Sequence, residues 1–174
     1  DSKRLLMKMG EIVGDLLADQ VNSGGADVVQ IFDTWAGLLS NEDYRNLSQI
    51  ATEKAIQVFR EKSKKFVPLI HYAKGSGHLH NQIRDMDIQG LSLDWRDDMR
   101  YNRENYGEMI AFQGNLDPSK LHGSTDVAKE AAARVLKVAG GKPGHIFNLG
   151  HGFAPSARID CVEAVIRTVC GDIP

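Results

Sequence analysis

The feature that most constrains this chain is a strict alternation of strand-like and helix-like segments along its 174 residues. Parallel strands need long crossover connections, and α-helices usually supply them. The alternation therefore predicts an α/β fold in which helices are the crossovers of a parallel sheet. Strands are predicted over residues 26–33, 67–73, 88–94, 109–113 and 145–149.

Amphipathic or polar segments around these strands predict the helices. The first helix has apolar residues at intervals of three and four, and Gly24 and Gly25 end it. Further helices are predicted over about 42–62, 78–86, 96–106 and 124–139, before a last helix near the C-terminus. The residues expected to face inward are Leu5, Met9, Ile12, Val13 and Leu16 in the first helix, Tyr44, Leu47, Ile50, Ile56 and Phe59 in the second, and Ile159, Val162, Val165, Ile166 and Val169 in the last.

Two architectures fit this alternation, a doubly wound open sheet and part of a (β/α)8 barrel. A closed barrel needs eight strands and about 250 residues. Five strands cannot close it, so the second architecture would be an incomplete barrel. In either case the length predicts a single domain over residues 1–174. The chain does not begin with Met, and we expect it to be part of a longer protein.

The composition excludes several classes of protein. With 42% hydrophobic residues and a net charge of −2, the chain is not of the disordered class. It has no apolar run of the roughly 18 residues that a membrane helix needs, so we expect no membrane segment. A pI near 6.3 argues against a nucleic-acid binder. Cys161 and Cys170 are too far apart on one helix for a disulfide, which predicts two buried thiols in a reducing, cytoplasmic compartment.

Polar side chains follow all five predicted strands at the point where each strand ends. The carboxyl ends of parallel strands form the face where α/β proteins bind ligands. This pattern is the main functional signal in the sequence. We expect one rim to carry Thr34, Lys74, Asp94, Gln113 and His151, with Asp33, Asn115 and Asp117 beside them.

Each of these residues also has a structural interpretation. Asp33 and Asp94 could cap the helices that follow them. The polar residues at 113–117 could hold a tight turn, and Lys74 could be a solvated charge. His151 differs because it lies between two glycines, where the backbone can turn sharply and aim the ring, which favours a function.

Cofactor motifs give only weak signals. The glycine-rich segment 139–144 precedes a strand, whereas a phosphate-binding loop follows one, and segment 150–155 has Pro155 where a dinucleotide fingerprint has its third glycine. The remaining histidines lack metal-ligand spacing, and no cysteine follows a strand. We therefore predict no cofactor and no metal.

Four motifs together carry a resemblance to a known family. They are QIFDTWAG (30–37), GLSLDW (90–95), QGNLDP (113–118) and NLGHG (148–152), and Lys74-Gly75 also fits. On these residues, in this order, the chain resembles the uroporphyrinogen decarboxylase family over its whole length. The resemblance implies the C-terminal half, about five β/α units, of a (β/α)8 TIM barrel.

The resemblance also implies an activity. Family enzymes remove carbon dioxide from the four acetate side chains of uroporphyrinogen III, giving coproporphyrinogen III in haem and chlorophyll synthesis. The family's N-terminal half carries arginines that grip substrate carboxylates, an acidic residue that faces the pyrrole nitrogens, and a tyrosine near the reacting acetate. None of those positions exists in this chain, so the activity is expected of the complete barrel. The implied partners are the tetrapyrrole substrate, the missing N-terminal half and a second copy in a homodimer.

Three site residues follow from the same resemblance. Thr34 matches a hydroxyl residue that contacts substrate, His151 matches an active-site histidine near a substrate carboxylate, and Phe32 matches an apolar residue that lines the cleft. His151 is the expected catalytic residue, either as a carboxylate binder or as a proton donor. No cofactor is required, because a protonated pyrrole of the substrate can accept the electrons that decarboxylation releases.

Two other functions remain open at this point. A cobalamin-dependent methyltransferase of the same superfamily would need His and Cys zinc ligands at strand ends, and the sequence has no cysteine there. A non-catalytic half-barrel would only pair with a partner chain. An open sheet of five strands would expose an apolar edge, so either half-barrel should associate or aggregate when alone.

Overall fold

The computed structural model describes residues 2–171, which include a five-stranded parallel sheet. All five predicted strands are confirmed, although each is shorter than its apolar run. Leu116 and Leu149 form one more parallel bridge beyond the last pair of strands. The strands are β1 (Val29–Phe32), β2 (Leu69–Tyr72), β3 (Gly90–Ser92), β4 (Ala111–Gln113) and β5 (His145–Ile146).

The order of the strands separates the two architectures. The sheet runs β1-β2-β3-β4-β5, so every strand lies beside its neighbour in the sequence. A doubly wound sheet reverses its winding at a switch point and therefore departs from sequential order. A (β/α)8 barrel keeps sequential order throughout. The prediction of part of a barrel is thus confirmed over the doubly wound alternative.

The helices lie between the strands as predicted. They are α1 (Ser2–Asn22), α2 (Asn41–Asp43), α3 (Ile50–Lys62), α4 (His80–Arg84), α5 (Met99–Tyr106), α6 (Thr125–Ala139) and α7 (Ile159–Cys170). Short turns of other helical types complete them: η1 (Ala36–Leu38), η2 (Tyr44–Gln49, a π-helix), η3 (Gly77–Leu79) and η4 (Pro118–His122). Within the described residues, no helix has the length and apolar character needed to cross a membrane.

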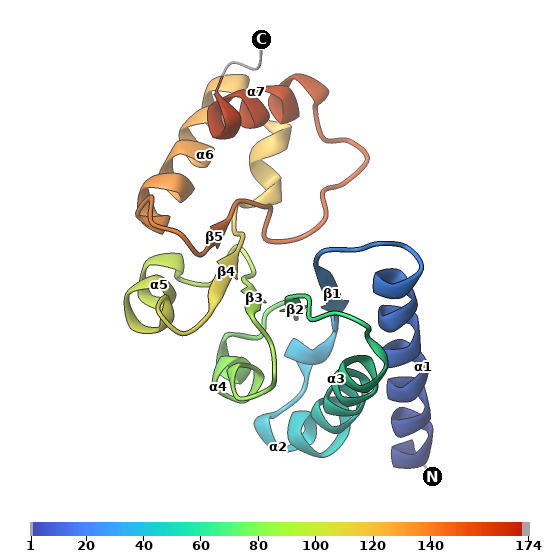
Figure 1. Ribbon diagram of the computed structural model, residues 1–174. Coiled ribbons are helices and arrows are strands. Elements are labelled where there is room, and N and C mark those ends of the chain that lie inside the picture. The colour runs from blue at the N-terminus through green and yellow to red at the C-terminus, as the bar shows by residue number, and fades with distance from the viewer. Residues whose placement is uncertain (1, 172–174) are drawn as a thin grey trace. The chain divides into compact units, whose positions relative to one another are not determined.

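The chain divides into two compact units, residues 1–91 and residues 92–174. Unit 1 holds α1 to α4 with β1 and β2, and unit 2 holds α5 to α7 with β4 and β5, while β3 contains the boundary. Figure 1 labels these elements along the chain. Whether residues 1–174 behave as a single domain stays a prediction.

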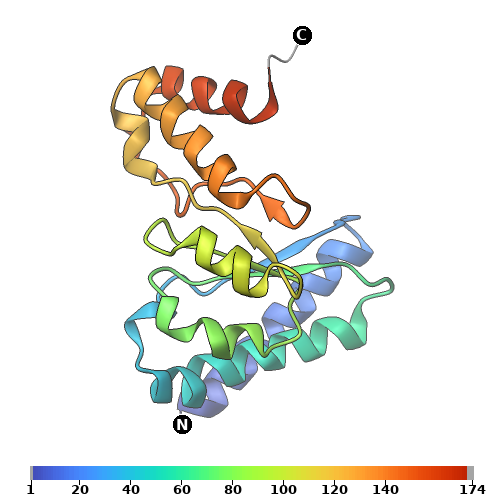
Figure 2. The same ribbon diagram turned by 90° about the vertical axis from the view of Figure 1, so that its left-hand side faces the viewer.

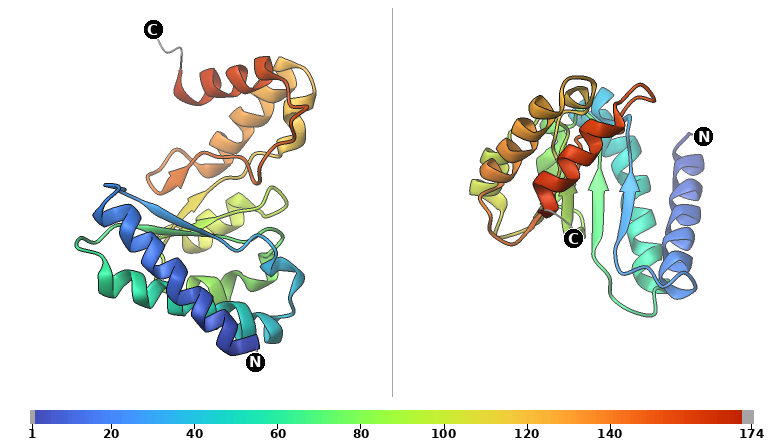
Figure 3. Two further views of the ribbon diagram at one scale, coloured as in Figure 1. Left: turned by 90° about the vertical axis from the view of Figure 1, so that its right-hand side faces the viewer. Right: turned by 90° about the horizontal axis from the view of Figure 1, so that it is seen from above.

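In unit 1, α1 packs lengthwise against α3, as Figures 1 and 3 show. The contact uses the small residues of α1, with Gly10, Gly14 and Ala18 buried together with Leu17 and Val21. A Cβ at Gly14 would lie 2.6 Å from the Ala55 carbonyl oxygen and 2.6 Å from the Val58 Cβ. Only glycine allows the two backbones to approach so closely.

The predicted buried stripe of α1 is wrong. Leu5, Met9, Ile12, Val13 and Leu16 are 63%, 52%, 57%, 36% and 56% exposed. The periodicity correctly identified a helix with an apolar face, but α3 takes the face of small residues instead. The close approach of the α1 and α3 backbones determines which side of α1 packs. The five larger apolar residues therefore form an exposed stripe on α1.

The inward residues predicted for the second helix are largely confirmed. Tyr44 and Phe59 are 0% exposed and Ile56 is 5% exposed, while Leu47 and Ile50 are half-buried. Ser40 begins this helical segment by accepting the Asp43 N–H. In the same unit, Leu69 of β2 is also fully buried.

In unit 2, α6 packs against α7, and the two helices lie side by side in Figure 2. Ser124 caps α6 by accepting the Val127 N–H. The core between the helices contains Ala128, Ala132, Cys161 and Val165.

The inward-facing residues predicted for α7 are only partly confirmed. Val165 is buried and Val162 and Val169 pack against the core, but Ile159 is 76% exposed and Ile166 is 45% exposed. The small side chains of Cys161 and Ala164 take part of the core-facing surface instead.

The prediction of two buried thiols is half right. Both cysteines are free thiols on α7, as expected from their spacing. Cys161 is buried against η4, but Cys170 is exposed. The difference arises because Cys170 is the last residue of α7, beyond the part of the helix that packs on the core.

Replacing Gly14 with alanine should lower the free energy of unfolding by about 1–2 kcal/mol. The new Cβ forces α1 away from α3, an overpacking cost that exceeds the better helix propensity of alanine. Leu16→Ala is the matched control, because its side chain is 56% exposed and its loss should cost less than about 1 kcal/mol. Urea denaturation measures both. A loss above about 2 kcal/mol in Leu16→Ala would show that the stripe is packed in solution.

A second prediction concerns His71 of β2, whose two ring nitrogens are buried without a hydrogen-bond partner. Burial, with a smaller effect of His80, lowers the pKa of His71 to about 4. Its contribution to stability is therefore complete above the unfolded-state pKa of about 6.5 and is lost as the pH falls towards 4. The loss should reach about 3 kcal/mol.

The variant His71→Leu isolates this effect, since the substituted chain has no group to titrate at this position. Its free energy of unfolding, measured at pH 4.5 and 7.5, should fall less between the two conditions than that of the wild-type chain. Equal slopes in the two proteins would contradict the assignment to His71.

Candidate functional site

The carboxyl end of β1 brings Phe32, Asp33 and Thr34 to the surface of unit 1. The Phe32 ring packs edge-on against Tyr72 at the end of β2, with ring centroids 6.0 Å apart and an interplanar angle of 63°. Phe32 is nevertheless 69% exposed. Thr34 is half-buried in the turn that follows. Phe32 thus presents an apolar surface at this strand end, and Thr34 lies two residues further along.

The Thr34 turn is held against the end of β2. The Lys74 backbone N–H donates to the Thr34 carbonyl at 3.3 Å. A Cβ at Gly37 would lie 2.0 Å from the Lys74 carbonyl oxygen, so this position requires glycine. Two of the predicted positions, Thr34 and Lys74, are therefore neighbours in unit 1.

Asp33 does not cap the next helix. Its carboxylate accepts a hydrogen bond from the Ser48 hydroxyl, which the π-helix η2 supplies. Burial raises the pKa of Asp33, although the Ser48 bond opposes this shift. Burial, with smaller effects of Asp33 and Glu53, also raises the pKa of Tyr44, whose hydroxyl is buried without a partner. These groups form a partly desolvated polar cluster beneath the strand end.

In unit 2, the loop after β3 is organised around Asp94, whose side chain is 0% exposed. Both carboxylate oxygens accept from the Arg96 guanidinium, at 2.7 Å from Nε and 2.8 Å from Nη2. The Arg96 backbone N–H donates to the same carboxylate at 2.9 Å. The helix-capping interpretation of Asp94 is wrong, since Asp98 caps α5 by accepting the Tyr101 N–H.

The same loop is tied down from both ends. Asp97 accepts the Asp94 backbone N–H at 2.9 Å. Asn115, from the loop after β4, donates from its side-chain nitrogen to the Asp94 carbonyl at 3.0 Å and to the Asp97 carbonyl at 2.8 Å. Burial raises the pKa of Asp97 to about 6, helped by the charge of Asp94 and opposed by the Asp94 N–H and Arg96.

The other polar residues at the end of β4 and after it have structural contacts. Gln113 donates from its side chain to the Ser92 hydroxyl at 3.1 Å across the strands. Asp117 accepts the Ser119 N–H at 2.9 Å and so begins η4. The turn-holding interpretation is confirmed for Asp117, and Asn115 extends it by holding the neighbouring loop.

His151 follows β5 and lies against Trp95 of the loop after β3. The two rings are stacked, with centroids 6.3 Å apart and an interplanar angle of 28°. A Cβ at Gly150 would lie 2.2 Å from the Trp95 backbone nitrogen, so the chain can pass Trp95 only with glycine at this position. The Gly150 N–H donates to the Leu116 carbonyl at 2.8 Å. The ring predicted to be catalytic is thus joined to the Asp94 loop within unit 2.

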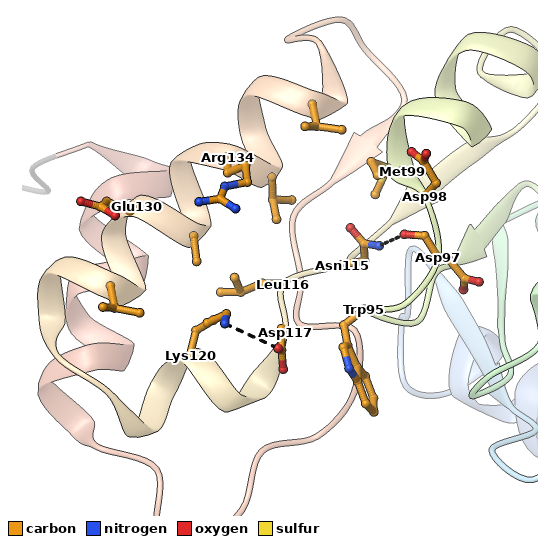
Figure 4. Close-up of a pocket in the computed structure, with 14 residues that line it drawn as sticks. Trp95, Asp97, Asp98, Met99, Asn115, Leu116, Asp117, Lys120, Glu130 and Arg134 are labelled. Atoms are coloured by element: carbon orange, nitrogen blue, oxygen red, sulfur yellow. Dashed lines mark hydrogen bonds and ion pairs between the residues drawn. The ribbon is translucent and has the colours of Figure 1, made fainter.

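A cavity of about 420 Å³ in unit 2 lies beside this cluster, between α6 and the loops after β3 and β4. Figure 4 shows acidic Asp97 and Asp98 on one side and Lys120, Glu130 and Arg134 on the other. Trp95 and Asn115 also line the cavity, but His151 does not.

The predicted residues therefore gather in two groups, one in each unit. Phe32, Thr34 and Lys74 belong to unit 1, and Asp94, Gln113 and His151 belong to unit 2. That all of them share one rim stays a prediction. Ser48, Arg96 and Asp97 were not among the residues expected from the sequence, and Trp95 was expected only as part of the GLSLDW motif. Three of these could have been suspected from the run WRDD directly after the third strand.

Comparison with known proteins gives a consistent family match. A family model described as uroporphyrinogen decarboxylase (URO-D) matches residues 1–171. A uroporphyrinogen decarboxylase of Coxiella burnetii (strain Dugway 5J108-111) is 39% identical over 170 residues, covering 95% of this chain and 46% of that protein. The protein of the same name from Koribacter versatilis (strain Ellin345) is 38% identical over 165 residues, with the same two coverages. The chain spans about half the length of these curated relatives.

A solved structure supports the fold. A methyltransferase from Methanosarcina mazei superposes with a TM-score of 0.73, at 21% sequence identity, over 91% of this chain and 46% of that chain. At this identity the similarity shows the fold alone. It agrees with half of a TIM-barrel-like architecture.

Asp97→Asn should stabilise the chain at neutral pH. The pKa of Asp97 is raised to about 6, so its favourable contribution is complete below the unfolded-state pKa of about 3.9 and is lost as the pH rises through 6. Asparagine keeps an oxygen to accept the Asp94 N–H but carries no charge. We expect a gain of about 1–2 kcal/mol at pH 7.5, after allowance for partial exposure, and almost none at pH 4.

The control for this measurement is Asp98→Asn at the neighbouring position. Asp98 is exposed and caps α5, and asparagine is an equally good cap. Chemical denaturation of this variant should give a change below about 0.5 kcal/mol at both pH values. A destabilised Asp97→Asn at pH 7.5 would show that the charge itself holds the loop.

Proposed function

Because the chain belongs to the uroporphyrinogen decarboxylase family, we propose that it supplies half of a decarboxylase active site. The substrate is uroporphyrinogen III, and the product is coproporphyrinogen III, an intermediate of haem and chlorophyll synthesis. Activity belongs to the complete barrel, because this chain spans about half of its relatives' length. The isolated chain is inactive.

The observation that carries this proposal is the fixed position of His151 at a strand end. Its ring is stacked on Trp95, and Gly150 holds the backbone against the same residue. A ring that lies against a residue of a neighbouring loop is suited to a preorganised role in binding or proton transfer.

The proposed decarboxylation depends more on groups that stabilise charge and transfer protons than on a cofactor. The bond between the acetate methylene and its carboxylate breaks, carbon dioxide leaves, and the electron pair passes into the protonated pyrrole ring. A proton then adds to the methylene carbon and completes the methyl group, while the ring loses its extra proton. His151 binds a substrate carboxylate as imidazolium or delivers a proton, Thr34 donates a hydroxyl hydrogen bond, and Phe32 forms an apolar wall.

The missing half of the barrel is the proposed partner, and unit 1 has the surface for it. The exposed stripe of α1 adjoins an apolar cavity of about 350 Å³, which is lined partly by Met9, Val13, Ile31 and Phe32. β1 is the terminal strand of the sheet, and α1 leads into it. A helix that leads into a parallel strand crosses over from a neighbouring parallel strand. The other half would supply that strand and cover the stripe.

Ile12→Asp tests this surface. We expect this chain to copurify in a one-to-one complex when it is expressed with the part of the Coxiella burnetii relative that it does not match. A charge at a position that is 57% exposed in the chain alone should abolish copurification without lowering its own melting temperature.

Phe66→Asp is the matched control for docking. Phe66 is 69% exposed and lies in the loop between α3 and β2, away from α1 in the sequence. The complex should survive this substitution. Copurification of the Ile12→Asp variant with the other half would contradict the proposed partner surface. So would a wild-type chain that stays a stable monomer in the presence of the other half.

His151→Asn in the complete complex tests the catalytic proposal. The residue is half-buried outside the core, so stability should change by less than about 1 kcal/mol. Loss of a charge-assisted carboxylate bond would weaken substrate affinity by about 1.5–3 kcal/mol, whereas loss of a proton donor would slow turnover by about 10² or more. Uroporphyrinogen consumption and the order of acetate loss distinguish these outcomes, and unchanged kinetics would refute both roles.

Two further properties belong to the same proposal. We expect the complete protein to act in the cytoplasm as a homodimer. A methyltransferase using a zinc-bound thiol is the competing function, but Cys161 lies on α7 against Gly123, not at a strand end. Decarboxylation by the reconstituted complex without added zinc or corrinoid would separate the two functions.

A further inference from the structure

Within the proposed function, we infer that Trp95 is a positioning residue that holds the His151 imidazole in its working orientation. His151 lies in a segment, residues 147–158, that has no helix and no ladder strand. The stack on the Trp95 ring, at 6.3 Å and 28°, supplies a flat surface against which the imidazole can rest.

A close backbone contact supports this stack. Gly150 passes so close to Trp95 that a Cβ would lie 2.2 Å from the Trp95 nitrogen and 2.8 Å from its Cβ. Leu116 also holds the Gly150 N–H at 2.8 Å. The backbone of the next residue, His151, is thereby held close to Trp95.

Trp95 can serve as a support because its own position is fixed. The Arg96 guanidinium lies over the indole, 4.8 Å from the ring centroid. Two hydrogen bonds to the fully buried Asp94 carboxylate hold that guanidinium, and Asn115 holds the loop backbone on both sides. The ion pair between the buried Asp94 carboxylate and Arg96 thereby holds Trp95, and Trp95 holds His151.

The direct test uses the 174-residue chain and nuclear magnetic resonance of its histidine rings. In Trp95→Leu, the His151 ring signals should move, because the ring current of the indole is gone and the imidazole samples more orientations. Trp95→Tyr should restore most of the wild-type position. Tyr101→Leu, an aromatic-to-leucine change on α5 in the same unit, should leave these signals in place. Unmoved His151 signals in Trp95→Leu would overturn the inference.

The kinetic test uses the complex with the other half of the barrel. Trp95→Leu should lower kcat between about 10- and 100-fold, as expected when a catalytic group is misplaced by about 1 Å. In a His151→Asn background the same change should have almost no further effect, because Trp95 acts through His151. Full additivity of the two substitutions would overturn the inference, even if both variants are slow.

The two tests also separate this inference from the proposed function. If the complex decarboxylates no substrate in any form, the proposed function fails, and the ring signals alone decide whether Trp95 positions His151. Thermal melting of Trp95→Leu and Trp95→Tyr checks folding. If the leucine variant unfolds, both the ring signals and kcat are compared between Trp95→Tyr and the wild-type chain. In that comparison, tyrosine should reduce kcat only a few-fold.

Discussion

A carboxylate that is completely buried must be paired, and this requirement at Asp94 organises the strand-end loops of unit 2. Its partner is Arg96, only two residues away, so forming the pair also closes the loop. Asn115 then joins this loop to the one after β4, and Gly150 brings the loop after β5 against it. Three loops from three strands thus depend on neutralising one charge.

The fold could be predicted well because its strongest signal, the alternation of strand-like and helix-like segments, extends along the whole chain. Alternating segments located all five strands, and the caps at Ser124 and Asp117 have the local chemistry that such positions need. Strand order was also inferable, since four strand-end motifs followed each other in the order of the uroporphyrinogen decarboxylase family. What periodicity could not decide was which side of an amphipathic helix packs. In α1 the side that packs is the one with Gly10 and Gly14, because without a Cβ these residues let the α1 and α3 backbones approach closely.

The site was only partly predictable for a related reason. Thr34, Lys74 and His151 could be identified because each follows a strand, and position alone marks them. Trp95 and Arg96 act through stacking and through a bidentate ion pair, contacts whose partners lie in the fold and have no sequence spacing of their own. Ser48, which donates to Asp33, belongs to the π-helix η2. No pattern of apolar residues in the sequence indicates a π-helix.

That π-helix has a consequence for how this part of the chain can vary in length. Residues 41–62 form one continuous helical segment, and the wide turn at 44–49 accommodates about one residue more than regular α-helix would. Ser48 and Tyr44 both depend on this extra residue to lie near Asp33. Losing it would restore ordinary helical register and rotate everything before it by about 100°. Insertions and deletions here would therefore be coupled to the identity of residue 33, although fifteen positions separate it from Ser48.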